Sequence, residues 1–157
     1  MLAVALAAAA LVPHGGVASC HADGRAAVAA TRLTMRLLGT DPQRLEPAEV
    51  DQALCADFDG DSRRDVAITI ASGGTAGDVG YAAFVRTPGG GWRAVLRGSG
   101  YKLGLFRLGR ELVVSQPVYR ANDPNCCPTG GFDHVRFRFA GGRFAVAGRS
   151  HTRSYRP

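Results

Sequence analysis

The chain alternates apolar and polar side chains over most of its length after Val50. A period of two places successive side chains on opposite faces of a strand, so the pattern predicts antiparallel β-structure with one packed and one solvated face. Turn-forming stretches separate the segments, as PGGG does at residues 88–91. The alternating segments are Val66–Ile70, Tyr81–Val85, Trp92–Leu96, Tyr101–Leu105, Leu112–Val114, Val135–Phe139 and Phe144–Val146.

The last two of these segments form the clearest predicted hairpin. Gly141 and Gly142 stand between them, and two glycines suit a two-residue turn that needs positive φ angles. Apolar residues at alternate positions of the first strand are expected to face the core. The intervening His134, Arg136 and Arg138 are expected to face solvent.

A helical pattern precedes the β-region. Asp23 suits the N-cap of a helix that runs from about Arg25 to Leu38, and Gly39 suits the position after its end. Its apolar stripe consists of Ala26, Ala30, Leu33 and Leu37. The whole pattern predicts an α+β fold that is mostly antiparallel β-sheet, with about seven strands and one N-terminal helix.

Length and composition fit one small domain whose basic charge is not concentrated in one segment. The chain has 157 residues, 46% of them hydrophobic, and a formal net charge of +6. The basic residues are 18 arginines and Lys102, and they are scattered along the chain. Nucleic-acid-binding proteins gather such charge on one face, so we expect no specific nucleic-acid partner. Weak attraction to anionic envelope polymers is the alternative that the charge allows.

The N-terminal residues predict export. Leu2–Val12 is an uncharged apolar run of 11 residues, which is too short to span a bilayer and has the length of a signal-peptide core. A buried core helix is the alternative. We expect residues 1–22 to be a signal peptide or lipoprotein signal, 23–149 a single domain and 150–157 a basic tail. The localisation that follows is secreted, periplasmic or lipid-anchored at the cell envelope.

An acidic loop is the first candidate site. Asp57, Asp59, Asp61 and Asp65 occupy positions 1, 3, 5 and 9 of DFDGDSRRD, and Arg63 offers a backbone carbonyl at position 7. Calcium takes six to eight oxygen ligands, so this spacing predicts a structural Ca²⁺ site. The loop is not an EF-hand, because Gly is missing from position 6 and Glu from position 12. A metal-free Asp-rich turn is the main alternative, and catalytic carboxylates are a minor one.

The cysteines are the second candidate feature. Cys126 and Cys127 are adjacent within DPNCCPTGG, and we expect each to pair with a distant cysteine. Cys55 is expected to pair with one of them and Cys20 with the other. VASC, which ends at Cys20, resembles the lipobox of bacterial lipoproteins, and this resemblance implies lipidation of Cys20 as an alternative to its disulfide. The sequence shows neither Cys-x-x-Cys nor zinc spacing, so the expected role is a stapled loop.

Two resemblances follow from these motifs. The D-x-D-G-D-x-x-x-D run at residues 57–65 resembles the calcium loop of FG-GAP or integrin-alpha repeats, in a single copy and without the FG and GAP parts. VASC at 17–20, DFDGDSRRDVAI at 57–68 and Y-x-x-x-D-P-N-C-C-P at 119–128 together resemble exported LppP/LprE-type lipoproteins. That resemblance implies an envelope-associated domain and no reaction.

The expected function is therefore an exported, non-catalytic, envelope-associated domain, with a structural calcium loop and an unknown partner or ligand. We expect a monomer that meets a membrane only through a lipid anchor. The chain has no G-x-S-x-G elbow or P-loop, and His134 and His151 do not mark a general base. A small hydrolase that uses the acidic loop and a binder of anionic polymer are the alternatives.

Overall fold

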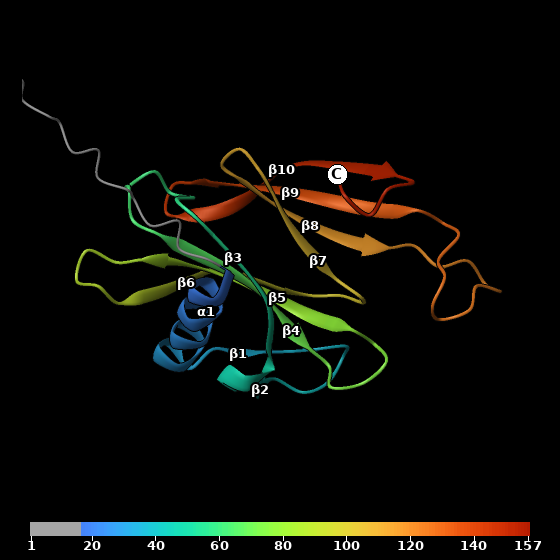
Figure 1. The fold of residues 1–157 in the computed structure, drawn as a ribbon, viewed down its shortest axis with the longest axis horizontal. Coiled ribbons are helices and arrows are strands. Elements are labelled where there is room, and N and C mark those ends of the chain that lie inside the picture. Colours follow the sequence, from blue (N-terminus) through green and yellow to red (C-terminus); the bar gives the residue numbers. More distant parts are fainter. Residues whose placement is uncertain (1–16) are drawn as a thin grey trace, which may run out of the picture.

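The computed structural model describes residues 17–157, with side chains from Cys20 onward, so the apolar run Leu2–Val12 lies outside the described residues. Two four-stranded antiparallel sheets are stacked, and one helix covers the outer face of the first sheet (Figure 1). The N-terminal elements are α1 (Val17–Thr31), β1 (Thr34–Met35), β2 (Gln43–Arg44) and the short 3₁₀ helix η1 (Pro47–Glu49). The first large sheet has the order β3-β4-β5-β6, namely Val50–Ala56, Asp65–Ala71, Asp78–Arg86 and Trp92–Ser99.

The second large sheet has the order β10-β9-β8-β7. Its strands in chain order are β7 (Gly104–Leu108), β8 (Glu111–Pro117), β9 (Phe132–Ala140) and β10 (Arg143–Thr152). The mostly antiparallel β class with one helix is thus confirmed. The expected number of about seven strands is wrong, since residues 17–157 contain ten. The difference is β3 and the two-residue pair β1 and β2, which are too short or too irregular to show a period of two.

The first sheet is packed on both faces. On β4, Val66, Ile68 and Ile70 belong to a core beneath α1, whereas Ala67 belongs to a second core between the two sheets. The whole strand except its last residue is buried. The expectation of one solvated face is therefore wrong for this sheet, because large residues meet the helix and the small alanine allows the second sheet to approach.

The helix lies earlier in the chain than its apolar stripe suggested. It ends at Thr31, and Arg32 has a φ of 49° that turns the chain out of the helix. Leu33 and Leu37 are buried as expected, but they lie on the extended segment that follows. The amide of Leu45 donates to the Leu33 carbonyl at 2.9 Å and holds that segment in place. Leu33 and Leu37 are apolar because they are buried, and their helix-like spacing in the sequence does not reflect a helix.

The boundaries of the other N-terminal features also differ. Asp23 lies inside α1 instead of capping it, and its carboxylate pairs with Arg64 at 2.5 Å. Gly39 lies in the turn between β1 and β2, where the amide of Thr40 donates to the carbonyl of Leu37. Arg64 comes from the loop before β4, so the charge on Asp23 ties the helix to the first sheet.

The predicted C-terminal hairpin is confirmed. β9 pairs antiparallel with β10, with Arg143 opposite Ala140, and Gly141 and Gly142 form the two-residue turn. Their φ angles are 59° and 81°, which is the region that this turn type requires. The strands are longer than the sequence pattern, since β10 continues to Thr152.

His134 does not face solvent. It is 1% exposed, its Nδ1 lies 2.6 Å from the Ser115 hydroxyl, and its Nε2 lies 2.8 Å from the Thr152 hydroxyl. Tyr155 folds back and packs edge-to-face on Phe132 with ring centroids 5.4 Å apart. The residues after the hairpin therefore cover part of the face that alternation alone assigned to solvent.

The strand expected at Tyr101–Leu105 begins later, at Gly104. Lys102 has a φ of 50°, so residues 101–103 form the turn that carries the chain from the first sheet to the second. Among the described residues, no helix is both long and apolar enough to cross a membrane.

Candidate metal-binding loop

The acidic loop connects β3 to β4 and is anchored by its second residue. Phe58 is 2% exposed and packs edge-to-face on Phe144, with ring centroids 5.6 Å apart. Phe144 belongs to β10, so the loop of the first sheet is attached to the second. This anchor leaves the aspartates on either side of Phe58 near the surface.

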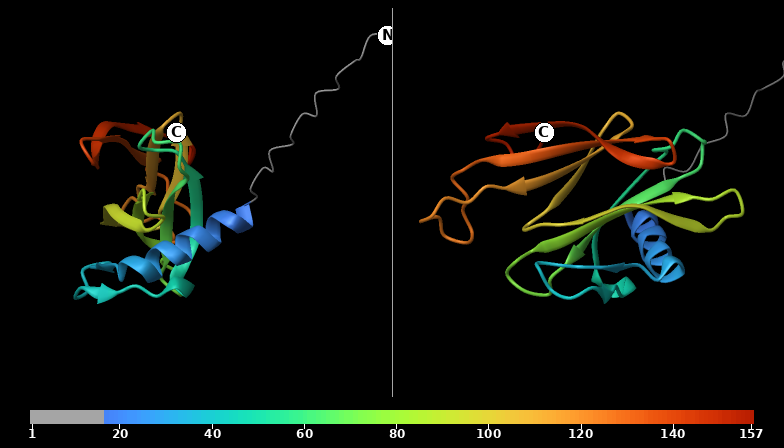
Figure 2. Two further views of the ribbon diagram at one scale, coloured as in Figure 1. Left: turned by 90° about the vertical axis from the view of Figure 1, so that its left-hand side faces the viewer. Right: turned by 180° about the vertical axis from the view of Figure 1, so that it is seen from behind.

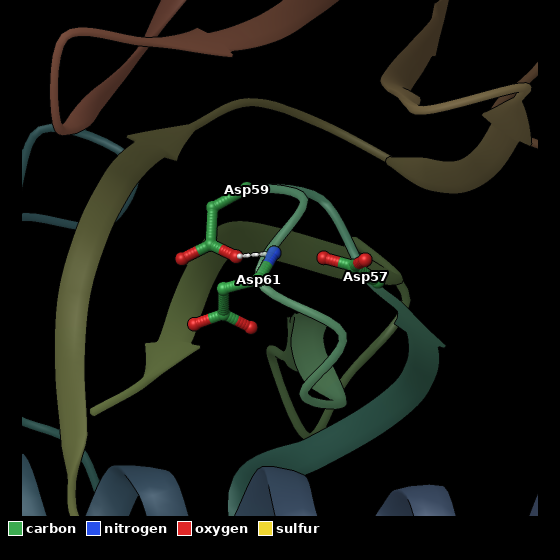
Figure 3. Close-up of side chains that lie close together, drawn as sticks. All are labelled: Asp57, Asp59 and Asp61. Atoms are coloured by element: carbon green, nitrogen blue, oxygen red, sulfur yellow. Dashed lines mark hydrogen bonds between the residues drawn. The ribbon is translucent and has the colours of Figure 1, made fainter. Parts of the chain in front are cut away.

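Three of the predicted ligands converge. One carboxylate oxygen from each of Asp57, Asp59 and Asp61 lies within 4.8 Å of the others, and all three residues are half-buried (Figure 3). Oxygens this close around a common centre are compatible with a hard divalent cation, which binds carboxylates at about 2.3–2.6 Å. These three carboxylates can therefore hold a metal ion.

The loop's own backbone already uses these carboxylates. The amides of Gly60 and Ser62 donate to the two oxygens of Asp57 at 2.6 and 3.1 Å. The amide of Asp61 donates to Asp59 at 3.2 Å, which is the dashed line in Figure 3. Asp side chains that accept amides a few residues on form tight turns. The spacing thus shapes the loop with or without an ion, and each oxygen keeps lone pairs for a cation.

Asp65 is not part of this cluster. Its side chain is 0% exposed. One oxygen accepts the Arg86 amide at 2.9 Å, and the other accepts the amides of Phe58 and Asp59 at 2.8 and 3.3 Å. The carboxylate binds the start of β4 to the loop and to the end of β5. Its predicted role as a fourth ligand does not agree with this geometry, because both oxygens point at amides in the interior.

Arg63 contributes a charge to the loop. Its guanidinium contacts Asp61, and its amide donates to the same carboxylate at 2.7 Å. The predicted role of its carbonyl as a ligand stays a prediction. Because the guanidinium competes with a cation for Asp61, an ion that binds all three carboxylates has to displace this contact.

A second arginine reaches the loop from the other sheet and was not identified from the sequence. A Cβ added at Gly60, whose φ is 85°, would lie 1.9 Å from Nη2 of Arg110. Arg110 is in the turn between β7 and β8. No local pattern links it to Gly60, because the contact depends on how the two sheets stack. Arg63 and Arg110 together offset part of the charge of the three carboxylates.

A surface hollow of about 600 Å³ lies beside the loop. Its polar residues include Asp59, Arg110 and Glu111. Glu111 is 7% exposed, and its carboxylate is held by Arg138 at 2.5 Å and by Arg136 at 3.3 Å. The buried carboxylate is thus already neutralised by two arginines of β9.

Two of the loop's carboxyl groups have raised pKa values. Burial raises the pKa of Asp59, and the neighbouring carboxylates of Asp61 and Asp57 raise it further, against the amide bond from Asp61. Burial also raises the pKa of Asp65, although three amides favour its ionised form. The amide bonds alone therefore do not fully offset the cost of these charges in the fold.

The cysteine pairing differs from the expectation. Cys20 of α1 is bonded to Cys55 of β3, and Cys126 is bonded to its neighbour Cys127. The Cα atoms of Cys20 and Cys55 are 5.8 Å apart, so the helix is crosslinked to an outer strand of the first sheet. The β8–β9 loop, which carries Cys126 and Cys127, lies at the opposite end of the fold from α1 (Figures 1 and 2). In this state the Cys20 sulfur is not available for a lipid.

The fold and the loop together describe a small α+β domain of two stacked sheets with a cluster of three carboxylates. Comparisons with known proteins found no matching family model, curated protein or solved structure. The resemblances to LppP/LprE-type lipoproteins and to FG-GAP loops therefore stay predictions from the residues quoted above.

Proposed function

We propose that the chain is an exported, non-catalytic, envelope-associated domain whose acidic loop holds a structural calcium ion. The observation that carries the calcium site is the convergence of Asp57, Asp59 and Asp61 within 4.8 Å. Export is supported by the apolar run at residues 2–12 and by the pairing of all four cysteines in disulfides.

A structural role is favoured over a catalytic one by what the carboxylates contact. Each of Asp57, Asp59 and Asp61 accepts an amide from its own loop. Asp65 is buried behind them with its oxygens on amides. An ion at this position removes the mutual repulsion of the three carboxylates and fixes the entry into β4. Extracellular modules bind calcium at about 10⁻⁴–10⁻³ M, which suits an ion that is always present outside the cell.

Thermal unfolding with and without calcium tests the proposal. We expect millimolar Ca²⁺ to raise the unfolding midpoint, because a ligand that binds only the folded state stabilises it by mass action. An excess of chelator should reverse the rise. In Asp57→Asn, which keeps an acceptor oxygen but loses a charge, the calcium effect should shrink severalfold.

The matched control is Asp41→Asn, since Asp41 is exposed and lies outside the loop. It should keep the full calcium effect. A midpoint that does not respond to calcium in the unmodified chain would exclude the metal site and leave the loop as an Asp-rich turn. The export half of the proposal has its own test, which is whether the chain is recovered outside the cytoplasm with its N-terminal segment removed.

A further inference from the structure

The loop between β8 and β9 carries a disulfide in an unusual place. Figures 1 and 2 show this loop projecting beyond the strands that it connects. Cys126 and Cys127 lie in it, are bonded to each other, and both have exposed side chains. By contrast, Cys20 is 9% exposed and its partner Cys55 is half-buried. The two disulfides therefore differ in their access to a reagent in solution.

The Cys126–Cys127 bond does not crosslink separate parts of the fold. Its two residues are neighbours in the chain, whereas Cys20 and Cys55 are 35 residues apart. Stabilisation by a disulfide comes mainly from the length of chain that it closes. A bond between neighbours closes almost none, so it is not explained as a staple of the tertiary structure.

Noncovalent contacts hold the loop independently of the disulfide. The Asp123 carboxylate accepts the Arg120 amide at 2.8 Å and both the amide and the hydroxyl of Thr129 at 2.7 Å. The Asn125 carbonyl accepts the Tyr119 hydroxyl at 2.7 Å. These bonds close the loop at its base and support the residue before Cys126. The loop can therefore keep its shape when the disulfide opens.

A cation lies at the peptide bond that precedes Cys126. The Lys102 ammonium contacts the Asn125 carbonyl, which belongs to the peptide that leads into Cys126. The Tyr101 hydroxyl donates to the side chain of the same Asn125. A nearby positive charge favours a thiolate over a thiol, and a more stable thiolate is a better leaving group in thiol–disulfide exchange.

We propose that the Cys126–Cys127 disulfide is a thiol–disulfide exchange site that an exogenous dithiol reduces while the domain stays folded. A thiolate of the dithiol attacks one sulfur of the pair and forms a mixed disulfide, and the other cysteine leaves as a thiolate. The second thiol of the reagent then attacks the mixed disulfide and releases the first cysteine. Two electrons and two protons pass to the protein, and the reagent leaves as its own disulfide. The proposal does not depend on the calcium loop or on export.

Selective reduction of the folded full chain tests this inference. The oxidised protein is exposed to low concentrations of dithiothreitol without denaturant, free thiols are alkylated, and each cysteine is quantified by mass spectrometry. We expect Cys126 and Cys127 to be reduced on the order of tenfold or more faster than Cys20 and Cys55, because of their exposure and the neighbouring cation. Oxidised glutathione should restore the bond. Equal rates for the two disulfides, or reduction only on unfolding, would overturn the proposal.

Two double variants separate an exchange site from a staple. Cys126→Ser with Cys127→Ser should keep the unfolding midpoint within about 2 °C of the unmodified chain, because the bond closes almost no loop. Cys20→Ser with Cys55→Ser should lower the midpoint clearly. A comparable drop in the first variant would show that the adjacent pair is structural and would contradict the proposal.

The contribution of Lys102 has its own readout. Lys102→Met keeps most of the apolar stem and removes the charge, and it should slow reduction of the pair by about threefold or more. Lys102→Arg, which keeps the charge, should restore most of the rate. A rate that is the same in all three proteins would overturn the assigned role of the Lys102 charge in stabilising the thiolate.

Discussion

Asp65 is the acidic residue on which the loop depends most. Its carboxylate is inaccessible to solvent and accepts three backbone amides from three places: the loop's second and third residues and the end of β5. Asp57, Asp59 and Asp61 are half-buried and accept amides only within the loop. The four aspartates of this short run therefore have two roles, three of them near the surface and Asp65 in the interior.

This difference predicts unequal costs of substitution. Asp65→Ala leaves three amides without their acceptor, and since a hydrogen bond to a buried charge is worth about 1.5–3 kcal/mol, the free energy of unfolding should fall by about 3 kcal/mol or more. Asp61→Ala in calcium-free buffer is the matched variant and should cost about 1 kcal/mol or less, because its carboxylate is only half-buried and water can replace it as the acceptor. Urea unfolding of both variants measures the comparison. Equal losses would contradict separate roles.

At the scale of elements, short-range patterns were predicted well and long-range ones were not. The β9–β10 hairpin followed from alternation and from Gly141-Gly142, which are all local signals. The helix end did not, because Leu33 stays buried after the chain leaves the helix at Arg32. Residues that meet because the sheets stack, such as Arg110 and Gly60, cannot be recognised from the local sequence around either residue.

The same limit applies to the candidate site. The spacing of the aspartates correctly predicted that three of them meet, because a loop of nine residues constrains them locally. It did not show that Asp65 turns inward, since that depends on the amide of Arg86 in another strand. The cysteine pairing was wrong for a related reason, because only the tertiary structure shows that Cys20 lies next to Cys55.

Two glycines in different hairpin turns form a matched pair. Gly142 has a φ of 81° and Gly89, in the turn after β5, has no positive φ, and an added Cβ meets nothing within 4 Å at either. Gly142→Ala should lower the free energy of unfolding by about 1–2 kcal/mol, because the left-handed region is costly for an L-residue. Gly89→Ala should be neutral or stabilising by up to about 1 kcal/mol. Chemical denaturation measures both, and the same sign in both variants would contradict the assigned turn geometry.

The contribution of the disulfide between α1 and β3 to the free energy of unfolding can be calculated. It spans 35 residues, and the chain-entropy relation gives about 3–4 kcal/mol for a loop of this length. Cys20→Ser with Cys55→Ser should lose about that much stability, measured by urea unfolding under oxidising conditions. A loss below about 1 kcal/mol would mean that the helix is held by its apolar contacts alone.

Residues 17–157 form three layers, namely α1 and the two large sheets, and polar side chains connect the two sheets alongside the apolar core between them. Gln52 of β3 accepts the Leu105 amide from β7 at 3.2 Å and donates to Asp78 of β5 at 2.8 Å. The Thr69 hydroxyl of β4 donates to the same carboxylate at 2.6 Å. Three strands of the first sheet therefore meet at one carboxyl group that is 6% exposed, and Gln52 connects that group to β7 of the second sheet.

This network predicts how stability changes with pH. Burial raises the pKa of Asp78 above its usual 3.8, the nearby Asp51 carboxylate raises it further, and the bonds from Thr69 and Gln52 oppose the rise. A carboxyl group whose pKa is higher in the folded than in the unfolded state favours folding while it is protonated. Its stabilising contribution is complete below the unfolded-state pKa and is lost as the pH rises through the raised value.

Comparison with Asp78→Asn reports this contribution together with its coupling to Asp51, because the amide does not titrate and carboxyl groups distant from Asp78 affect both proteins alike. Urea unfolding from about pH 3 to about pH 7 covers the range of titration. The free energy of unfolding of the unmodified chain, minus that of the variant, should fall as the pH rises and then level off. A difference that grows with pH would mean that the bonds from Thr69 and Gln52 outweigh burial, and that the connection between the sheets is built for the charged carboxylate.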